Sequence, residues 1–256
     1  MSIRISGAGP DLVLIHGWAM HGGIFAPLAD LLSAHFRLHV VDLPGHGHSR
    51  EFISGELDPA RVATAIVAQT PPAIWLGWSL GGLIALRAAL DFPERVQGLV
   101  AMASSPRFVR GDDWSNAVSV EIFRDFGVAL AAGFRPTIDR FVALETLGSA
   151  HAQEELRELK AHVFERGEPS LAALQEGLEL LETFDARAEL DGLGMPSLWL
   201  AGRRDRIVTP SAMRWAAEQC PSGQFIELPS AHAPFLSDPQ RVADAIIAFA
   251  DSRVHA

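Results

Sequence analysis

Short, uninterrupted apolar runs alternate along this chain with stretches of helical periodicity. The apolar runs are residues 11–15, 36–41, 73–76, 97–102, 197–201 and 224–228. The helical patterns between them are residues 24–33, 58–69, 80–91, 211–218 and 239–251. Runs that are apolar throughout are typical of strands whose two faces are both covered by helices. The alternation therefore predicts an α/β fold with a doubly wound, mostly parallel sheet, to which residues 3–6 are expected to add an edge strand.

One long interval breaks this alternation. Residues 107–190 show helical patterns but no convincing strand, and they are expected to form an all-helical cap inserted in a core of residues 1–106 and 191–256. The start signals predict four helices, which begin at Asp112 or Asp113, Thr137, Ser149 and Ser170. Such an insertion is expected to lie over the carboxyl ends of the strands, where sheets of this type bind ligands. An accessory bundle without contact to the site is the alternative.

Composition limits the classes of partner and the compartment. The 256 residues suit one α/β unit, and 48% hydrophobic with 20% charged residues is ordinary for a globular protein with a large core. The net charge of -10 argues against binding nucleic acid or anionic membranes. Cys220 is the only cysteine, so the chain forms no internal disulfide. With neither a secretory signal nor an apolar stretch of membrane-spanning length, the expected location is the cytoplasm.

The segment Gly77-Trp78-Ser79-Leu80-Gly81 follows an apolar run and precedes a helical pattern. At a turn this tight, Ser79 adopts strained backbone angles, and the glycines two residues before and after it remove side chains that would collide. The serine hydroxyl is then exposed above the sheet, with the N-terminus of the next helix behind it to stabilise negative charge. The pattern favours a catalytic nucleophile over the alternative, a glycine-rich turn with a bystander serine.

Two residues that a nucleophilic serine requires follow later apolar runs. Asp205 comes just after residues 197–201, and His232 comes just after residues 224–228. A serine needs a base to take its proton and an acid to orient that base. The chain order Ser79, Asp205, His232 therefore predicts a catalytic triad at three strand ends. Taken singly, His232 is one of ten histidines and Asp205 has arginine neighbours, so the prediction depends on the whole set.

Acyl transfer also needs donors for the negative charge that develops on the ester oxygen. The first core run ends in a His-Gly-Trp loop, and the backbone N–H groups of Trp18 and Leu80 are the expected oxyanion hole. Each such donor is worth about 3 kcal/mol. His16 is expected to form a structural hydrogen bond, and His46 and His48 to shape a turn rather than bind a metal. The sequence has no phosphate loop, dinucleotide fingerprint or zinc signature, so we expect no cofactor and no metal.

On these motifs the chain resembles the α/β-hydrolase superfamily over its whole length. It is similar in particular to the pimeloyl-[acyl-carrier protein] methyl ester esterases of biotin synthesis. The segments that carry this narrower resemblance are residues 16–18, 41–45, 74–82, 93–97, 103–106, 140–144 and 231–235. The resemblance implies hydrolysis, through an acyl-serine, of the methyl ester on a pimeloyl chain held by acyl carrier protein. A monomer is the expected form.

Residue types near the predicted site suit a seven-carbon acyl chain. The residues expected to wall an apolar slot for it are Trp18, Trp78, Phe141, Leu144 and Ile207. Core packing is the competing interpretation, above all for Trp78 and Leu144.

The resemblance further implies that arginines of the cap dock the acidic carrier. Arg140 and Arg157 match such positions, whereas Pro136 and Gln153 stand where the family has arginine. Arg135, one position away, is expected to substitute. A solvated helix face is the alternative for each arginine. Competing functions are a short-chain carboxylesterase acting on free esters, a C–C bond hydrolase or thioesterase, and a non-catalytic binding protein on the same fold.

Overall fold

The seven strands that the structure describes form a single sheet. The computed structural model describes residues 1–149 and 151–252 of the chain. The strands are β1 (Ser2–Gly7), β2 (Asp11–Ile15), β3 (Arg37–Asp42), β4 (Ala73–Trp78), β5 (Val96–Met102), β6 (Ser197–Gly202) and β7 (Gly223–Leu228). Their order across the sheet is β1-β3-β2-β4-β5-β6-β7, and every pair is parallel except β1 with β3. The predicted α/β fold class and the edge strand are confirmed.

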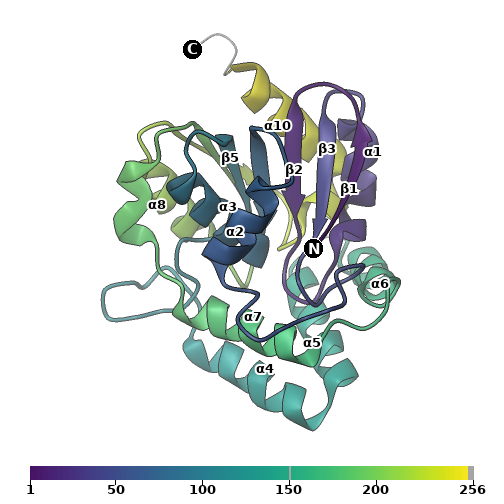
Figure 1. Ribbon diagram of the computed structural model, residues 1–256. Coiled ribbons are helices and arrows are strands. Elements are labelled where there is room, and N and C mark those ends of the chain that lie inside the picture. The colour runs from purple at the N-terminus through teal and green to yellow at the C-terminus, as the bar shows by residue number, and fades with distance from the viewer. Residues whose placement is uncertain (150, 253–256) are drawn as a thin grey trace.

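Helices cover both faces of the sheet (Figure 1). The core helices are α1 (Ala26–Leu32), α2 (Pro59–Val67), α3 (Leu80–Asp91), α8 (Pro210–Gln219) and α10 (Pro239–Ser252), with the shorter η1 (Gly22–Phe25), η2 (Arg187–Gly192) and α9 (Pro234–Ser237). From β2 the chain moves toward the β1 edge of the sheet to form β3, and from β3 it moves toward the opposite edge, which β7 forms. Because crossovers between parallel strands are right-handed, α1 lies on the face opposite to α2, α3 and α8, and α10 packs beside α1.

The central strands explain why the sequence runs are apolar throughout. All residues of β4 are buried, and in β2 the side chains of Leu12, Leu14 and Ile15 have no exposed surface. Helices contact both faces of these strands, so neither face favours polar side chains. Burial of an aliphatic side chain of this size contributes about 1.5–3 kcal/mol each.

Between β5 and β6 the chain forms four helices beyond the ends of the strands. They are α4 (Val120–Ala132), α5 (Phe134–Thr146), α6 (Ala152–Val163) and α7 (Leu171–Thr183), and in Figure 1 they lie together below the sheet. Backbone hydrogen bonds join them to loops at the carboxyl ends of the strands: Ser170 N–H donates to the Gly45 carbonyl, and His232 N–H donates to the Glu145 carbonyl. Through α5 and α7, the inserted helices therefore contact the edge of the sheet where ligands bind in such folds.

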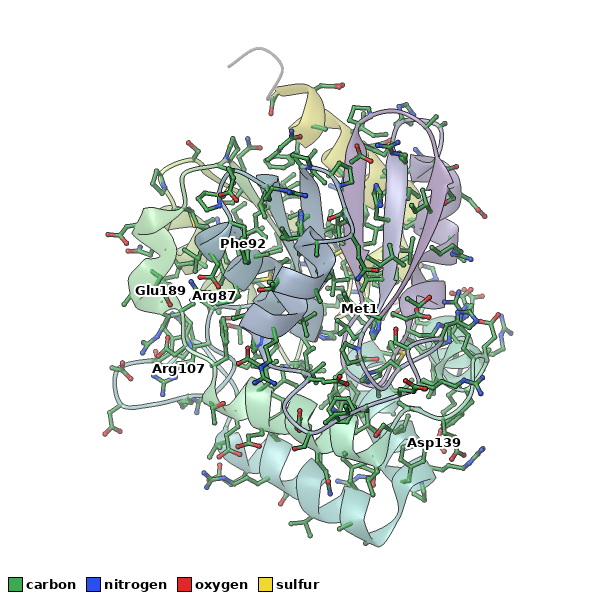
Figure 2. All side chains as sticks on the ribbon, viewed as in Figure 1. Met1, Arg87, Phe92, Arg107, Asp139 and Glu189 are labelled. Carbon is green, nitrogen blue, oxygen red and sulfur yellow. The ribbon has the colours of Figure 1, made fainter. Side chains whose placement is uncertain are left out.

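The predicted start of the first of these helices is wrong. The helix begins at Val120, not at Asp112 or Asp113, and a loop precedes it. The carboxylate of Asp113 does not cap a helix, because it accepts hydrogen bonds from Arg187 and from Arg107, which is labelled in Figure 2. The carboxylate that suggested a helix start thus pairs instead with arginines outside the predicted helix.

Two further starts differ by three residues, and one is confirmed. Helix α5 begins at Phe134, and the Thr137 hydroxyl donates to the Gly133 carbonyl one turn earlier. Helix α6 begins at Ala152, while the Ser149 hydroxyl donates to the Glu155 carboxylate in its first turn. Ser170 is the N-cap of α7 as predicted. In the described ranges 1–149 and 151–252, the helices are all too short or too polar to cross a membrane.

Candidate active site

Ser79 occupies the turn between β4 and α3 in a conformation that non-glycine residues rarely adopt. Its φ is 55° and its ψ is −120°, and it is the N-cap of α3. A Cβ at Gly77 would lie 2.2 Å from the Gly81 carbonyl oxygen, and a Cβ at Gly81 would lie 2.3 Å from the Ile15 carbonyl oxygen. Both glycines are therefore needed for close backbone approach, and the second one lets α3 approach β2.

The loop after β2 lies directly beside this serine. Strands β2 and β4 are paired, with Ile15 opposite Gly77, and their onward connections leave in opposite directions across the sheet. Such a reversal is where α/β sheets bind ligands. A Cβ at Gly17 would lie 3.2 Å from the Ser79 Cβ. Trp18 follows Gly17, and Leu80 is the first residue of α3, so both residues of the predicted donor pair are next in the chain to residues in this contact. Their role as an oxyanion hole stays a prediction.

The structure brings Ser79, His232 and Asp205 together from three loops. The Nε2 atom of His232 lies 2.8 Å from Ser79 Oγ, and its Nδ1 atom lies 2.7 Å from Asp205 Oδ2. Because a carboxylate only accepts hydrogen bonds, the ring proton of neutral His232 lies on Nδ1. Nε2 is then free to accept the proton of the serine hydroxyl. All three side chains are almost fully buried.

Backbone groups fix the acid and the base. The second oxygen of Asp205, Oδ1, accepts hydrogen bonds from the N–H groups of Ile207 at 2.8 Å and Val208 at 2.9 Å. The Trp78 indole N–H donates to the His232 carbonyl oxygen at 2.8 Å, and the Trp78 ring packs edge-on against Phe235. These contacts restrict both side chains to the geometry that proton transfer needs.

The five predicted slot residues lie in different surroundings. Trp18 and Phe141 pack edge to face, with ring centroids 4.6 Å apart, and the Trp18 indole N–H donates to the Leu174 carbonyl of α7. The Trp78 side chain supports His232, as described above. The backbone of Ile207 holds Asp205, while its side chain is buried.

Leu144 is half-buried in a groove between α4 and α5 with a volume of about 470 Å³. This groove is lined by Ile122, Asp125, Phe126, Arg140, Ala143, Leu144 and Leu147. The lining contains neither Ser79 nor His232, so this face of Leu144 points to a surface different from the serine site.

The predicted docking arginines differ in their partners. Arg135 pairs with Glu168 and lies over the Phe164 ring, 4.5 Å from its centroid. Arg140 lies over the Phe126 ring at 5.5 Å, and both Arg140 and Arg157 are exposed. Within the part of the chain that the structure describes, neither of these two forms an ion pair. These two are therefore open to a partner, whereas Arg135 already has Glu168 as an ion-pair partner.

Ionisable groups are buried next to the serine loop. The N–H of Leu43 donates to Nε2 of His16, so the proton on Nδ1 is directed to the Gly17 carbonyl, as a structural role requires. Burial lowers the pKa of His16 to about 3 and that of His46 to about 4. Both rings are therefore neutral at physiological pH.

Asp42, at the end of β3, connects this region to the four inserted helices. Its carboxylate accepts from the N–H groups of Gly22 and His48 and from Arg166, which follows α6, at 3.1 Å. Burial opposes its ionisation, but these donors and the nearby His16 hold its pKa below the ordinary value. The Arg166–Asp42 ion pair is mostly buried and ties the inserted helices to the sheet.

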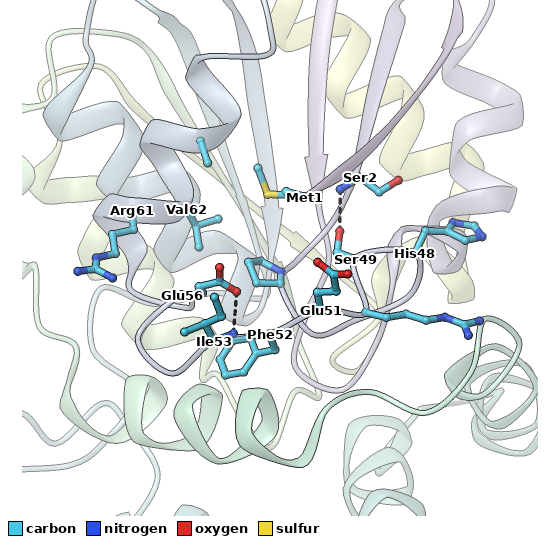
Figure 3. A pocket seen from close by; sticks show the side chains of 13 residues that line it. Met1, Ser2, His48, Ser49, Glu51, Phe52, Ile53, Glu56, Arg61 and Val62 are labelled. Atoms are coloured by element: carbon cyan, nitrogen blue, oxygen red, sulfur yellow. Dashed lines mark hydrogen bonds between the residues drawn. The ribbon is translucent and has the colours of Figure 1, made fainter.

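A separate surface cavity of about 1100 Å³ opens beside the N-terminus (Figure 3). It is lined by Met1 and Ser2, by the loop after β3, and by Arg61, Val62 and Ala65 of α2. The Ser2 N–H donates to the Ser49 hydroxyl. Its lining includes two cations, Arg50 and Arg61, and two acids, Glu51 and Glu56, so it favours no ligand of one charge. It contains none of the three residues of the serine site. In residues 1–149 and 151–252 no cluster of three or more His, Cys, Asp or Glu is arranged for a metal ion.

The sequence did not indicate several residues that contact the site. Leu174, Val208 and the backbone of Glu145 act through main-chain atoms, which carry no side-chain signal. Glu145 had one recognisable signal, an acid at an inward position of an amphipathic helix, where burial is unusual.

The family model described as the alpha/beta hydrolase fold matches residues 10–239. Among solved structures, an esterase from Exiguobacterium antarcticum superposes with a TM-score of 0.87 at 19% identity, covering 97% of this chain and 94% of that one. An enol-lactonase from Burkholderia xenovorans superposes with a TM-score of 0.82 at 21% identity, covering 100% and 96%. These two likenesses establish the fold.

Curated relatives are much closer in sequence. A pimeloyl-[acyl-carrier protein] methyl ester esterase from Stenotrophomonas maltophilia is 54% identical over 250 residues, which cover 96% of this chain and 95% of the relative. A protein of the same name from Xanthomonas axonopodis pv. citri is 52% identical over 253 residues, which cover 98% and 99%. The chain therefore belongs to the α/β-hydrolase fold family and, within it, to the pimeloyl-[acyl-carrier protein] methyl ester esterases.

Proposed function

We propose that the chain is a serine carboxylesterase that hydrolyses the methyl ester of pimeloyl-[acyl-carrier protein] in biotin synthesis. The observation that carries this proposal is the hydrogen-bonded path from Asp205 through both ring nitrogens of His232 to the Ser79 hydroxyl. That path supplies the chemistry of ester hydrolysis. The names of relatives at 52% and 54% identity support the substrate.

In the first half of the reaction, Ser79 Oγ attacks the ester carbonyl carbon while His232 Nε2 takes the hydroxyl proton. Asp205 stabilises the imidazolium and keeps its Nδ1–H directed inward. The N–H groups of Trp18 and Leu80 then bind the negatively charged oxygen. When the tetrahedral intermediate collapses, His232 returns the proton to the leaving methoxide, and methanol departs from an acyl-serine.

In the second half, water attacks the acyl-serine and gives its proton to His232. Collapse of this second intermediate breaks the bond to Ser79 Oγ, which recovers the proton from His232. The products are a free carboxylate on the pimeloyl chain and the unchanged serine. The whole cycle uses side chains and backbone groups of this chain, so it calls for no cofactor.

The inserted helices, residues 107–190, act as a cap in this proposal. Ser79 and His232 are almost fully buried, and Trp18 contacts both Phe141 of α5 and the Leu174 carbonyl of α7. The acyl chain therefore reaches the serine along this aromatic contact, where Trp18 and Phe141 form its apolar wall. Displacement of α7 by a few ångströms would admit a chain while the Glu145 carbonyl of α5 stays in contact with the His232 N–H.

Arg140 and Arg157 are the proposed docking residues for the acidic carrier. Both are exposed cations of the cap that keep their charge free, and Arg140 stands at the rim of an apolar groove. Arg135 contributes only if it exchanges Glu168 for the carrier. Since opposite charges on two proteins accelerate encounter, these residues should affect the capture of the carrier more than the chemical step.

A short-chain carboxylesterase acting on free esters is the second candidate. It is favoured by the ion pair that already engages Arg135 and by residues other than arginine, Pro136 and Gln153, at two of the docking positions. The decisive experiment compares kcat/KM for pimeloyl-carrier methyl ester with kcat/KM for a free short methyl ester. A large preference for the carrier-bound ester supports the proposal. Equal values, or a preference for the free ester, would overturn it in favour of the second candidate.

We further place the enzyme in the cytoplasm as a monomer. Its single cysteine suits a reducing compartment, and a carrier-bound substrate requires the same compartment as the carrier. Size-exclusion chromatography with light scattering measures the mass directly.

A further inference from the structure

A further ionisable side chain is enclosed beside the Asp205–His232 pair and has no role in the proposed hydrolysis. Glu145 lies in the last turn of α5, and only 1% of its surface is exposed. Its carbonyl oxygen accepts a hydrogen bond from the His232 backbone N–H at 3.2 Å. One residue of the cap therefore contacts the backbone of the base and also carries a carboxyl group into the enclosed space next to it.

The position of Glu145 on its helix is one that normally holds an apolar residue. Ile138, Phe141 and Val142 form the buried stripe of α5, and Glu145 follows them at helical spacing. Neither oxygen of its carboxyl group has a hydrogen-bond partner among the described residues. A buried carboxylate without a partner is strongly unfavourable, so the protonated form is favoured here. Burial raises the pKa of Glu145 well above its ordinary value, and the charge of Asp205 raises it further.

Among the residues that the structure describes, no neighbouring cation compensates for a negative charge on the Glu145 side chain. The ionisable residues on neighbouring elements are Asp205 and Arg204 before α8, His232 before α9, Glu155 on α6, and Glu121, Arg124 and Asp125 on α4. The three charged residues of α4 are exposed, and Arg124 pairs with Glu182. Glu155 accepts hydrogen bonds from two serine hydroxyls. Arg204 packs against the turn after α5 through its Cβ and backbone, at Gly148.

Of the two acidic residues that contact His232, only Asp205 has hydrogen-bond donors that favour a carboxylate. Its oxygens accept two backbone N–H groups and the imidazole Nδ1–H, whereas those of Glu145 accept none. We propose that Glu145 is a positioning residue for His232: its main-chain carbonyl holds the His232 N–H, and its side chain, as an uncharged carboxylic acid, stays enclosed with the end of α5 and leaves Asp205 as the only negative charge beside the imidazole. This inference rests on the proposed serine-esterase function and adds a residue to its site.

The proposal has a direct consequence for the pH profile. Loss of the Glu145 proton would place a second carboxylate next to Asp205 in an enclosed space. Movement of the α5 end toward water relieves this repulsion, but it withdraws the carbonyl that holds the His232 N–H. We therefore expect kcat to fall as Glu145 ionises, by about tenfold for each pH unit above the midpoint, with little change in KM.

The test combines a substrate-free titration with kinetics. Carbon-13 NMR of wild-type protein labelled at the glutamate carboxyl should show one resonance that titrates far above the others and is absent from Glu145→Gln. The kcat of wild type on a short free ester should fall with the same midpoint, and the profile of Glu145→Gln should lack this fall. Glu154→Gln, at an exposed position on α6 with 70% of its side chain accessible, is the matched control and should keep the wild-type profile.

Three results would overturn the proposal. The first is a Glu145 carboxyl resonance that titrates in the ordinary acid range. The second is an alkaline fall of kcat in Glu145→Gln that equals the fall in wild type. The third is a shift of the acid limb of the kcat profile to lower pH in Glu145→Gln, which would show that Glu145 is charged in wild type. If Glu145→Gln does not fold, Glu145→Leu replaces it, since Ile138, Phe141 and Val142 form the same buried stripe of α5. Failure of the carrier-bound ester to react would count against the proposed substrate alone, because neither measurement uses that ester.

Discussion

His232 Nε2 lies 2.8 Å from Ser79 Oγ, although 153 positions separate the two residues along the chain. This distance suits transfer of the hydroxyl proton to the imidazole. Trp78, next to the serine, donates its indole N–H to the carbonyl of the same histidine, so the segment that carries the nucleophile also orients the base.

Replacement of Ser79 by alanine is expected to lower kcat by at least about 10⁴-fold, because the nucleophile is lost while the donors and the binding surface stay. Ester turnover with purified protein measures the effect. The free energy of unfolding should change by no more than about 1 kcal/mol, since one hydroxyl hydrogen bond is removed. Retained turnover in a folded Ser79→Ala protein would contradict the assignment of the triad.

Gly81→Ala should destabilise the protein by about 3 kcal/mol or more, because the new Cβ would lie 2.3 Å from the Ile15 carbonyl oxygen and force α3 away from β2. Urea denaturation measures the free energy of unfolding. Gly127→Ala is the matched control. Gly127 lies inside α4 with nothing within 4 Å of the added methyl group, so this variant should gain about 0.5–1 kcal/mol. Similar effects of the two substitutions would show that the close contact is not what requires glycine.

Charge reversal at Arg140 and Arg157 together should raise KM for the carrier-bound ester about tenfold at low salt and leave kcat nearly unchanged. The difference from wild type should shrink as ionic strength rises, because exposed charges are screened. Initial rates over a range of salt concentrations provide the measurement.

Arg124→Glu is the control for this docking prediction. Arg124 is a cap arginine that already pairs with Glu182, with 2.6 Å between Nη2 and Oε1, so its reversal should affect KM less. Turnover of a free short ester should not respond to any of these changes. A KM for the carrier-bound ester that is insensitive both to salt and to reversal would show that the carrier docks elsewhere.

Acid should destabilise the protein through its buried histidines. Because the pKa of His46 falls from 6.5 to about 4 on folding, its contribution to stability is complete above pH 6.5 and is lost as the pH falls toward 4. Between pH 7 and pH 5 this one ring accounts for about 2 kcal/mol. His46→Gln should therefore show a free energy of unfolding that falls by about 2 kcal/mol less than that of wild type over this interval. Urea denaturation at the two pH values measures this, and an equal fall in the free energy of unfolding of the two proteins would refute it.

The sequence by itself determined the order of the strands and helices of the core, and the positions of Ser79, Asp205 and His232 at strand ends. These features depend on local periodicity, on the glycines around the serine, and on chain order. Short apolar runs between helical patterns favour buried strands, because both faces of such a strand are covered. The helix starts were less predictable. Asp113 resembles an N-cap, yet its carboxylate accepts a hydrogen bond from Arg187, which is distant in sequence.

Only the tertiary structure decided which surfaces meet. It placed Gly17 beside Ser79 and brought the Trp78 indole N–H to the carbonyl of His232. It also exposed one face of Leu144 in an outer groove and enclosed the carboxyl group of Glu145 beside Asp205. Contacts of this kind join residues that are far apart along the chain. They follow from how strands pair and how the inserted helices pack on the loops, which no local pattern of residues encodes.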